Sequence, residues 1–191
     1  MLIDLIKSRH SIRKYTDKEI SRENLEKILE AGIYAPNAGG GQRSMLVAVH
    51  NKELTTYIGH LNMAHFDRTH LAGSYVSKEQ PSTIDDSTIK NGFYDAPTVI
   101  CVFCQDNFLF KTADAFCIIE NMILQATELG ISSCIISRGQ ETFASEEGKR
   151  LMDNWQVPAG YSCEGFVILG DINGDYPLRK PRKLNRIKII D

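Results

Sequence analysis

The chain has 191 residues, 42% hydrophobic and 24% charged, a composition typical of one globular domain, here residues 1–191. Its formal net charge of −2 argues against a nucleic-acid partner, because non-specific nucleic-acid binders are usually strongly basic. No basic segment precedes a long apolar run at the start, and no uncharged apolar run has membrane-spanning length. We therefore expect no signal peptide, no membrane contact and a cytoplasmic location.

The first half of the chain alternates between helical and extended patterns. Apolar residues at helical spacing predict a short helix over 2–8 and a longer one over 22–34, with Ser21 as its N-cap and Pro36 beyond its end. A strand is predicted over 45–49 and a short helix over 52–61. The polar, irregular stretch that follows, up to residue 92, is interpreted as a segment that covers a pocket.

The second half contains the most apolar segments. It predicts a buried strand over 98–104, a long helix over 113–129 that ends at Gly130, and a strand over 131–136. Because the apolar residues of the long helix cover more than one face, we expect it to be central or to lie in a subunit interface. A turn over 137–140, a surface helix over 144–154, a strand over 163–170 and an extended tail over 171–191 complete the prediction.

Cations gather near both ends of the chain. Arg9 and Arg13 flank Ser11 with the i, i+4 spacing that lets two guanidinium groups grip an anion from two sides. Taken alone, such a cluster is more often a solvated surface turn, and it is the rest of the chain that favours a site. The tail carries a second basic block without any acid, which needs an anionic partner or solvent: Arg179, Lys180, Arg182, Lys183, Arg186 and Lys188.

The segment from Ala35 to Gln42 contains three consecutive glycines, Gly39 to Gly41. It is not a phosphate-binding P-loop, since no Lys-Ser/Thr pair follows and the loop comes after a helix. A flexible linker is the alternative, but a glycine loop held between a helix and a strand more often serves a site.

The cysteines and histidines do not form a recognisable metal site. Cys101 and Cys104 have C-x-x-C spacing, but in a strand their side chains point to opposite faces, so we expect buried, reduced thiols. The same interpretation extends to the other three cysteines, Cys117, Cys134 and Cys163. His65 and His70 are five residues apart, which suits no compact metal signature. We therefore expect no metal ion.

The order of these motifs resembles that of the nitroreductase-like flavoproteins. The matching segments span nearly the whole chain: Arg9–Arg13, Ala35–Ala38 with Gln42, Tyr94–Pro97, Asp114, Ala126–Gly130 with Ser133 and Cys134, Gly165–Gly170, and Lys180–Arg182. The chain departs from the family pattern at Gly40, where an asparagine is usual, and at Arg43 and Ser44, where a proline and an aromatic residue are usual.

The resemblance implies an α+β fold, a three-layer sandwich whose central mixed, mostly antiparallel sheet is flanked by helices. It implies a homodimer with one FMN at each end of the interface and a C-terminal arm exchanged between subunits. The FMN-binding residues that it implies are Arg9, His10, Ser11, Arg13, Ser137, Arg138, Gly139, Lys180 and Arg182, with Pro36, Asn37, Ala38 and Gly40 from the other subunit.

The resemblance also implies an FMN-dependent oxidoreductase that takes hydride from NADH or NADPH and reduces an electron-poor small molecule, such as a nitroaromatic or a quinone, by ping-pong kinetics. The flavin carries the chemistry, so no catalytic side chain is expected. The glycine departure motivates an alternative, a flavin-binding or flavin-sensing protein without nicotinamide turnover. Flavin destruction and reductive dehalogenation are related enzymatic alternatives on the same fold.

Overall fold

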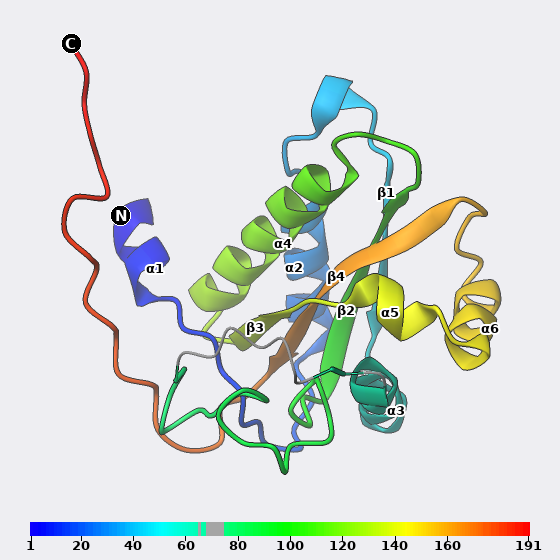
Figure 1. The fold of residues 1–191 in the computed structure, drawn as a ribbon, viewed down its shortest axis with the longest axis horizontal. Helices are drawn as coiled ribbons and strands as arrows, with labels where there is room; N and C mark the ends of the chain where they lie inside the picture. The colour runs from blue at the N-terminus through cyan, green and yellow to red at the C-terminus, as the bar shows by residue number, and fades with distance from the viewer. Residues whose placement is uncertain (65, 68–74) are drawn as a thin grey trace.

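The computed structural model describes residues 1–64, 66–67 and 75–191, which form three layers (Figure 1). The middle layer is an antiparallel sheet in the order β1-β2-β4-β3, made of Ser44–Val49, Thr98–Gln105, Tyr161–Gly170 and Ser132–Ile136. Helices α2 and α4 (Arg22–Ile33 and Lys111–Glu128) cover one face. Helices α3, α5 and α6 (Lys52–Ala64, Gly139–Phe143 and Glu146–Asn154) cover the other, and α1 and the 3-10 helix η1 (Leu2–Ser8 and Ala38–Gly40) lie at the periphery.

This architecture confirms the predicted α+β sandwich. The described strands of the sheet pair in antiparallel fashion, and a parallel pairing occurs as an isolated bridge between Ser11 and Ser133. The exchange of the C-terminal arm between two subunits stays a prediction.

Strand β2 belongs to both halves of the core because its side chains alternate between the two faces of the sheet. Ile100, Val102 and Cys104 pack with α2 and α4. Cys101 and Phe103 pack into the cluster on the opposite face, with α3 and α5. The two cysteines therefore face opposite ways, as predicted, and burial raises the pKa of the Cys104 thiol to about 12 and that of Cys101 further still. Neither is a reactive thiol or half of a metal-binding pair.

Most predicted elements are present, with ends that shift by one to three residues. Helix α2 begins after Ser21, whose hydroxyl accepts a hydrogen bond from the N–H of Asn24 at 3.2 Å.

Two predictions are wrong. The predicted turn over 137–140 gives way at Gly139 to helix α5, because Arg138 takes a left-handed conformation (φ 69°) from which the helix starts. Cys117 is exposed rather than buried, because it lies on α4 away from the face that the sheet covers.

Strand β4 begins at Tyr161, two residues before its predicted start, and contains a bulge. Its register against β2 shifts so that Gly165 and Cys163 have consecutive partners, which leaves Glu164 as the extra residue. The Glu164 side chain is 3% exposed and accepts hydrogen bonds from Thr112 at 2.7 Å and Gln140 at 2.9 Å, with the Lys111 ammonium at 3.1 Å. Burial acts to raise the pKa of Glu164, but these bonds outweigh it and lower the pKa. The bulge thus ties the starts of α4 and α5 to the sheet.

Beyond β4 the chain runs as an extended arm past α1, which confirms the predicted extended tail (Figure 1). The arm ends in exposed apolar side chains, among them Leu184 (87% exposed) and Ile187 (85% exposed). No helix in the described part of the chain is both long and apolar enough to cross a membrane. Within those residues no group of three or more His, Cys, Asp or Glu side chains is arranged for a metal, while His65 and His70 lie outside them.

Candidate functional site

The site starts at an extended segment that follows α1 and runs beside the edge strand β3. Ile12 anchors this segment: its side chain is 1% exposed, and its backbone N–H donates to the carbonyl of Ser133 at 3.0 Å. Neighbouring side chains of an extended chain alternate in direction, so burial of Ile12 turns those of Ser11 and Arg13 the other way. One core residue, Ile12, therefore sets the direction of the Ser11 and Arg13 side chains in the predicted Arg-x-Ser-x-Arg motif.

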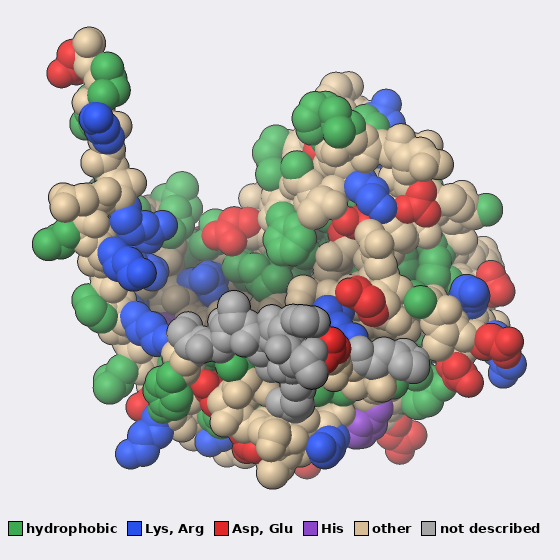
Figure 2. All heavy atoms as spheres, in the orientation of Figure 1, with side chains coloured by type: hydrophobic (Ala, Val, Ile, Leu, Met, Phe, Trp, Pro, Cys, Tyr) green, Lys and Arg blue, Asp and Glu red, His purple; other side chains and the backbone are tan. Residues whose placement is uncertain are grey.

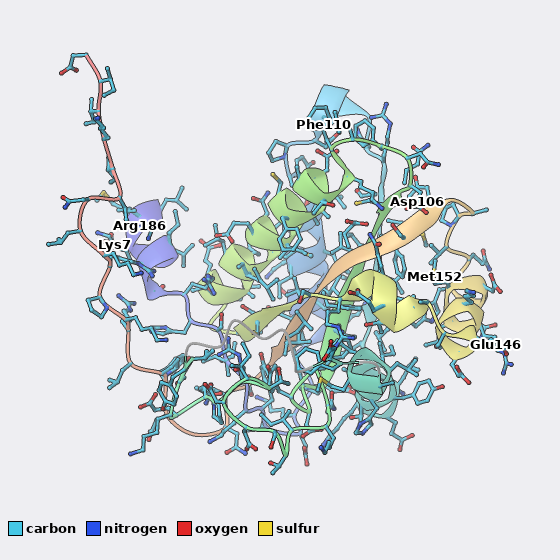
Figure 3. All side chains as sticks on the ribbon, in the orientation of Figure 1. Lys7, Asp106, Phe110, Glu146, Met152 and Arg186 are labelled. Carbon is cyan, nitrogen blue, oxygen red and sulfur yellow. The ribbon has the colours of Figure 1, made fainter. Side chains whose placement is uncertain are left out.

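The C-terminal arm completes a strongly basic cavity of about 460 Å³ against this segment. In Figure 2, Lys and Arg side chains gather where the arm passes the body of the molecule, and Figure 3 shows Lys7 of α1 and Arg186 of the arm on this side. Among described residues the lining contains no Asp or Glu. It carries six cations together with His10 and Ser11: Lys7, Arg9, Arg13, Arg179, Lys180 and Arg182.

The hydrogen bonds around this basic cavity go to neutral groups. Arg9 Nη1 lies 3.4 Å from the Ser11 hydroxyl, and Lys180 Nζ donates to the carbonyl of Tyr75 at 2.6 Å. The His10 ring packs edge-on against Tyr176, at 5.7 Å between centroids, and its Nε2 accepts from Arg179 Nε at 3.4 Å. These contacts orient the cations without neutralising them, so the cavity suits a multiply charged anion such as a phosphate monoester.

A second cavity of about 200 Å³ adjoins the basic one, because Arg13 and Val76 line both. It contains two of the predicted residues, Ser137 and Arg138. The guanidinium of Arg138 lies 4.7 Å from the centroid of the Phe66 ring, and its Nη1 is buried without a hydrogen-bond partner among the described residues. A buried donor of this kind fits a ligand that presents a hydrogen-bond acceptor.

The predicted Gly139 follows Arg138, a lining residue of this second cavity, in the chain. It is buried at the start of α5, and a Cβ placed on it would lie 2.4 Å from the carbonyl oxygen of Cys163. Only glycine therefore allows the Ser137–Gly139 segment to lie this close to β4. Asn62 holds the same segment from α3, donating to the carbonyl of Ser137 at 3.1 Å and to the Thr142 hydroxyl at 2.9 Å.

The lining of the second cavity also includes residues that the sequence does not predict for the site, among them Asn62, Phe66 and Tyr94. Asn62 is 4% exposed on α3, beyond the predicted end of that helix at residue 61. The signal available was an asparagine in phase with the helix's buried face. Tyr94 lies within the Tyr94–Pro97 segment that resembles the family, but it is not among the residues that the resemblance implies for FMN binding. Phe66 follows the helix without a local pattern to single it out.

The remaining predicted residues, Pro36, Asn37, Ala38 and Gly40, lie elsewhere. Ala38 donates its backbone N–H to the carboxylate of Asp114, in the first turn of α4, at 3.0 Å. Arg9 and His10 instead line a cavity with Thr127 near the other end of α4. Asp114 and Thr127 are thirteen positions apart on the helix, a rise of about 20 Å. A single chain therefore brings the cations and the Ser137–Gly139 segment together, but not the segment from Pro36 to Gly40.

The sequence from residue 6 to residue 171 matches the family model described as the nitroreductase family. The chain belongs to the nitroreductase family. The matched residues include the whole lining of the second cavity and the N-terminal cations of the basic cavity. The cations of the arm lie beyond the matched residues.

Solved and curated nitroreductases show how far the likeness extends. A crystal structure of a nitroreductase with bound FMN from Bacteroides fragilis is 30% identical, with a TM-score of 0.83, and the match covers 100% of this chain and 98% of that one. A protein from Methanothermobacter thermautotrophicus named NADH dehydrogenase/NAD(P)H nitroreductase is 27% identical over 136 residues, 69% of this chain and 58% of that protein. One of the same name from Archaeoglobus fulgidus is 42% identical over 52 residues, 27% of this chain and 30% of that protein. The matches thus span less than two thirds of each curated relative.

Proposed function

We propose that this nitroreductase-family protein is an FMN-dependent NAD(P)H oxidoreductase that reduces an electron-poor small molecule such as a nitroaromatic or a quinone. The observation that carries the proposal is the pair of adjoining cavities. One is lined by six cations, and the other contains the Nη1 of Arg138, which has no hydrogen-bond partner in the part of the chain that the structure describes. A phosphate monoester joined to a ring system with hydrogen-bond acceptors matches both. The Bacteroides fragilis structure, a nitroreductase with bound FMN, supports the choice of FMN among such molecules.

The residues of this chain would hold the cofactor by its two ends. Arg9, Arg13, Lys180 and Arg182 would bind the phosphate through charge-assisted hydrogen bonds, with Ser11 as a neutral partner and His10 orienting the arm through Arg179. Ser137, Arg138 and Gly139 would border the ring. When bound, FMN supplies the hydride and electron transfer between a reduced nicotinamide and the acceptor, which use the site in turn with ping-pong kinetics. The surrounding cations would favour negative charge on the bound cofactor.

The same proposal includes a homodimer. Pro36, Asn37, Ala38 and Gly40 lie at one end of α4 and the cations at the other, so they would contribute to one site only when two chains meet. The single chain also exposes apolar side chains that a partner would cover, notably on α1, at the start of α4 and on the arm: Leu2, Ile3, Leu109, Phe110, Leu184, Ile187 and Ile189. Figure 3 shows Phe110 at the top of the view, on the far side of α4 from its C-terminal end, and Lys7 at the left beside the arm.

The absorption spectrum of the purified protein, recorded before and after anaerobic addition of NADH or NADPH, tests the proposal. A flavin spectrum that bleaches is expected. The double variant Arg9→Ala/Arg182→Ala should purify without flavin, whereas Arg22→Ala/Arg150→Ala should keep it, since those arginines pair with Glu26 and Glu146 on exposed helix faces. A colourless wild-type protein that FMN does not reconstitute refutes the proposal, as does a double variant that binds FMN as tightly as wild type.

A second candidate function is flavin binding or sensing without nicotinamide turnover. Gly40, at the position where the family usually has asparagine, has a left-handed φ of 63° and no atom within 4 Å of an added Cβ, so the contact of an asparagine side chain is missing. Stopped-flow measurement of flavin bleaching separates the two functions. Bound flavin that stays oxidised with both NADH and NADPH favours the sensing function, and rapid bleaching favours the oxidoreductase.

A further inference from the structure

Gln80 is a fully buried side chain where three distant segments of the chain meet. It is 0% exposed; its Oε1 accepts the backbone N–H of Arg13 at 2.7 Å, and its Nε2 donates to the carbonyl of Asp175 at 3.2 Å. Arg13 lies 67 residues before it and Asp175 95 residues after it. A buried amide with both ends bonded constrains the groups that it joins, since breaking either bond would leave a buried polar atom unpaired.

Both groups that Gln80 joins carry cations of the basic cavity. Arg13 also donates from its Nη1 to the backbone carbonyl of Gln80 at 3.4 Å, so both its backbone and its guanidinium are held. Asp175 lies in the arm five residues before Lys180, and Lys180 in turn donates to the carbonyl of Tyr75. The short segment from Tyr75 to Gln80 therefore contacts the N-terminal cations and the arm at the same time.

This segment is itself held by a set of hydrogen bonds to one carboxylate. Asp85 accepts the backbone N–H groups of Val76 at 2.7 Å, Ser77 at 3.2 Å and Ser82 at 2.9 Å. Burial acts to raise the pKa of Asp85, but these bonds outweigh it and lower the pKa, so the carboxylate is ionised at neutral pH. The N–H of Gln80 donates to the Ser77 hydroxyl at 3.1 Å, which connects Gln80 to this hydrogen-bonded loop.

We propose that Gln80 is a positioning residue of the basic cavity, which sets the spacing between Arg13 and the cations of the arm. It does not line the cavity and acts through the two backbones that it bonds. The inference rests on the proposed function, because it concerns the site assigned to the FMN phosphate. Its consequence is specific: loss of Gln80 weakens recognition of the phosphate and spares recognition of the flavin ring.

The affinities of the full chain for FMN and for riboflavin, measured by quenching of flavin fluorescence, test this inference. Riboflavin lacks the phosphate, so the ratio of the two dissociation constants isolates the phosphate contacts. Gln80→Met keeps the side-chain volume and removes both bonds, and should lower the preference for FMN about tenfold, the value of one charge-assisted hydrogen bond. Gln80→Asn, one methylene shorter, should act in the same direction if the first variant folds poorly. Gln105→Met, at the exposed end of β2, is the matched control and should leave the ratio unchanged.

Lys180→Met supplies a second criterion. If Gln80 positions the arm, Lys180 is already displaced in Gln80→Met. The loss of FMN affinity caused by Lys180→Met should then be smaller in the Gln80→Met background than in wild type. Two outcomes would overturn the role of Gln80. One is an unchanged ratio of the FMN and riboflavin dissociation constants in Gln80→Met, and the other is additive effects of Gln80→Met and Lys180→Met on FMN affinity. In these cases a wild-type preference for FMN still supports the proposed function. A wild-type protein without any preference for FMN over riboflavin refutes both.

Discussion

Replacement of Gly139 by alanine tests how closely the Ser137–Gly139 segment must approach the sheet. Gly139 begins α5, and its backbone is not in the left-handed region, so its requirement is space rather than conformation. The added Cβ would lie 2.4 Å from the carbonyl oxygen and 2.7 Å from the carbonyl carbon of Cys163, both backbone atoms of β4. Neither can rotate away, so the start of α5 must move.

The size of the movement follows from these contacts. An ordinary contact begins at 3.4 Å, so the segment must shift by 1.0 Å, the difference between 3.4 and 2.4 Å. Overpacking of this kind costs about 2 kcal/mol of the free energy of unfolding, which lowers Tm by roughly 4–8 °C for a chain of this size. The shift also moves Arg138 and Ser137, and loss of one ring contact would weaken FMN binding about five- to tenfold.

Gly130→Ala is the matched control. Gly130 has a left-handed φ of 71° and open space around an added Cβ, so alanine there costs about 1 kcal/mol through backbone strain alone. Differential scanning fluorimetry and FMN titration of both variants separate the two effects: Gly130→Ala should lose stability and keep its FMN affinity, and Gly139→Ala should lose both. A Gly139→Ala protein with wild-type Tm and FMN affinity would show that the close approach to β4 is not required.

Three further predictions concern stability and assembly. Because the pKa of Glu164 is lowered in the folded state, its contribution to stability is present above its ordinary pKa of 4.5 and is lost as the pH falls through the lowered pKa. Urea unfolding of Glu164→Gln should therefore show a smaller loss of stability in acid than wild type. An unchanged slope of the free energy of unfolding against pH would contradict this. Ser21→Ala should lower the free energy of unfolding by about 1 kcal/mol through loss of the helix cap, with Ser8→Ala, exposed in the last turn of α1, as comparison. Deletion of residues 184–191, whose apolar side chains are exposed in the single chain, should convert a dimer to monomers in light scattering, and an unchanged mass would refute an interfacial role of the arm's end.

The features that the sequence predicts best depend on short-range periodicity. The alternation along β2 predicts that Cys101 and Cys104 lie on opposite faces of the sheet, and each packs into a different half of the core. The i, i+4 spacing of Arg9 and Arg13 predicts that both can reach one anion, and both line the basic cavity. The family resemblance then adds the arm's cations, Lys180 and Arg182, which the structure places with Arg9 and Arg13 around one cavity.

The features that were missed depend on buried polar residues and on contacts between distant segments. Glu164 lies near the predicted start of a strand, and no local pattern shows that a bulge buries it against Lys111. Gln80 lies in a stretch that looks irregular, and its importance comes from partners 67 and 95 residues away. The burial of such residues is decided by tertiary contacts, which propensity and periodicity do not encode.

The position of the η1 loop at one end of α4, with the cations at the other, has a genetic consequence. In a dimer with shared sites, a chain that lacks Arg9 and a chain damaged at Asn37 would each be inactive alone. Mixed together, they would form heterodimers in which one site has both defects and the other has neither. Two inactive proteins would thus restore flavin binding and turnover on being combined, a behaviour that sites contained within a single subunit do not produce.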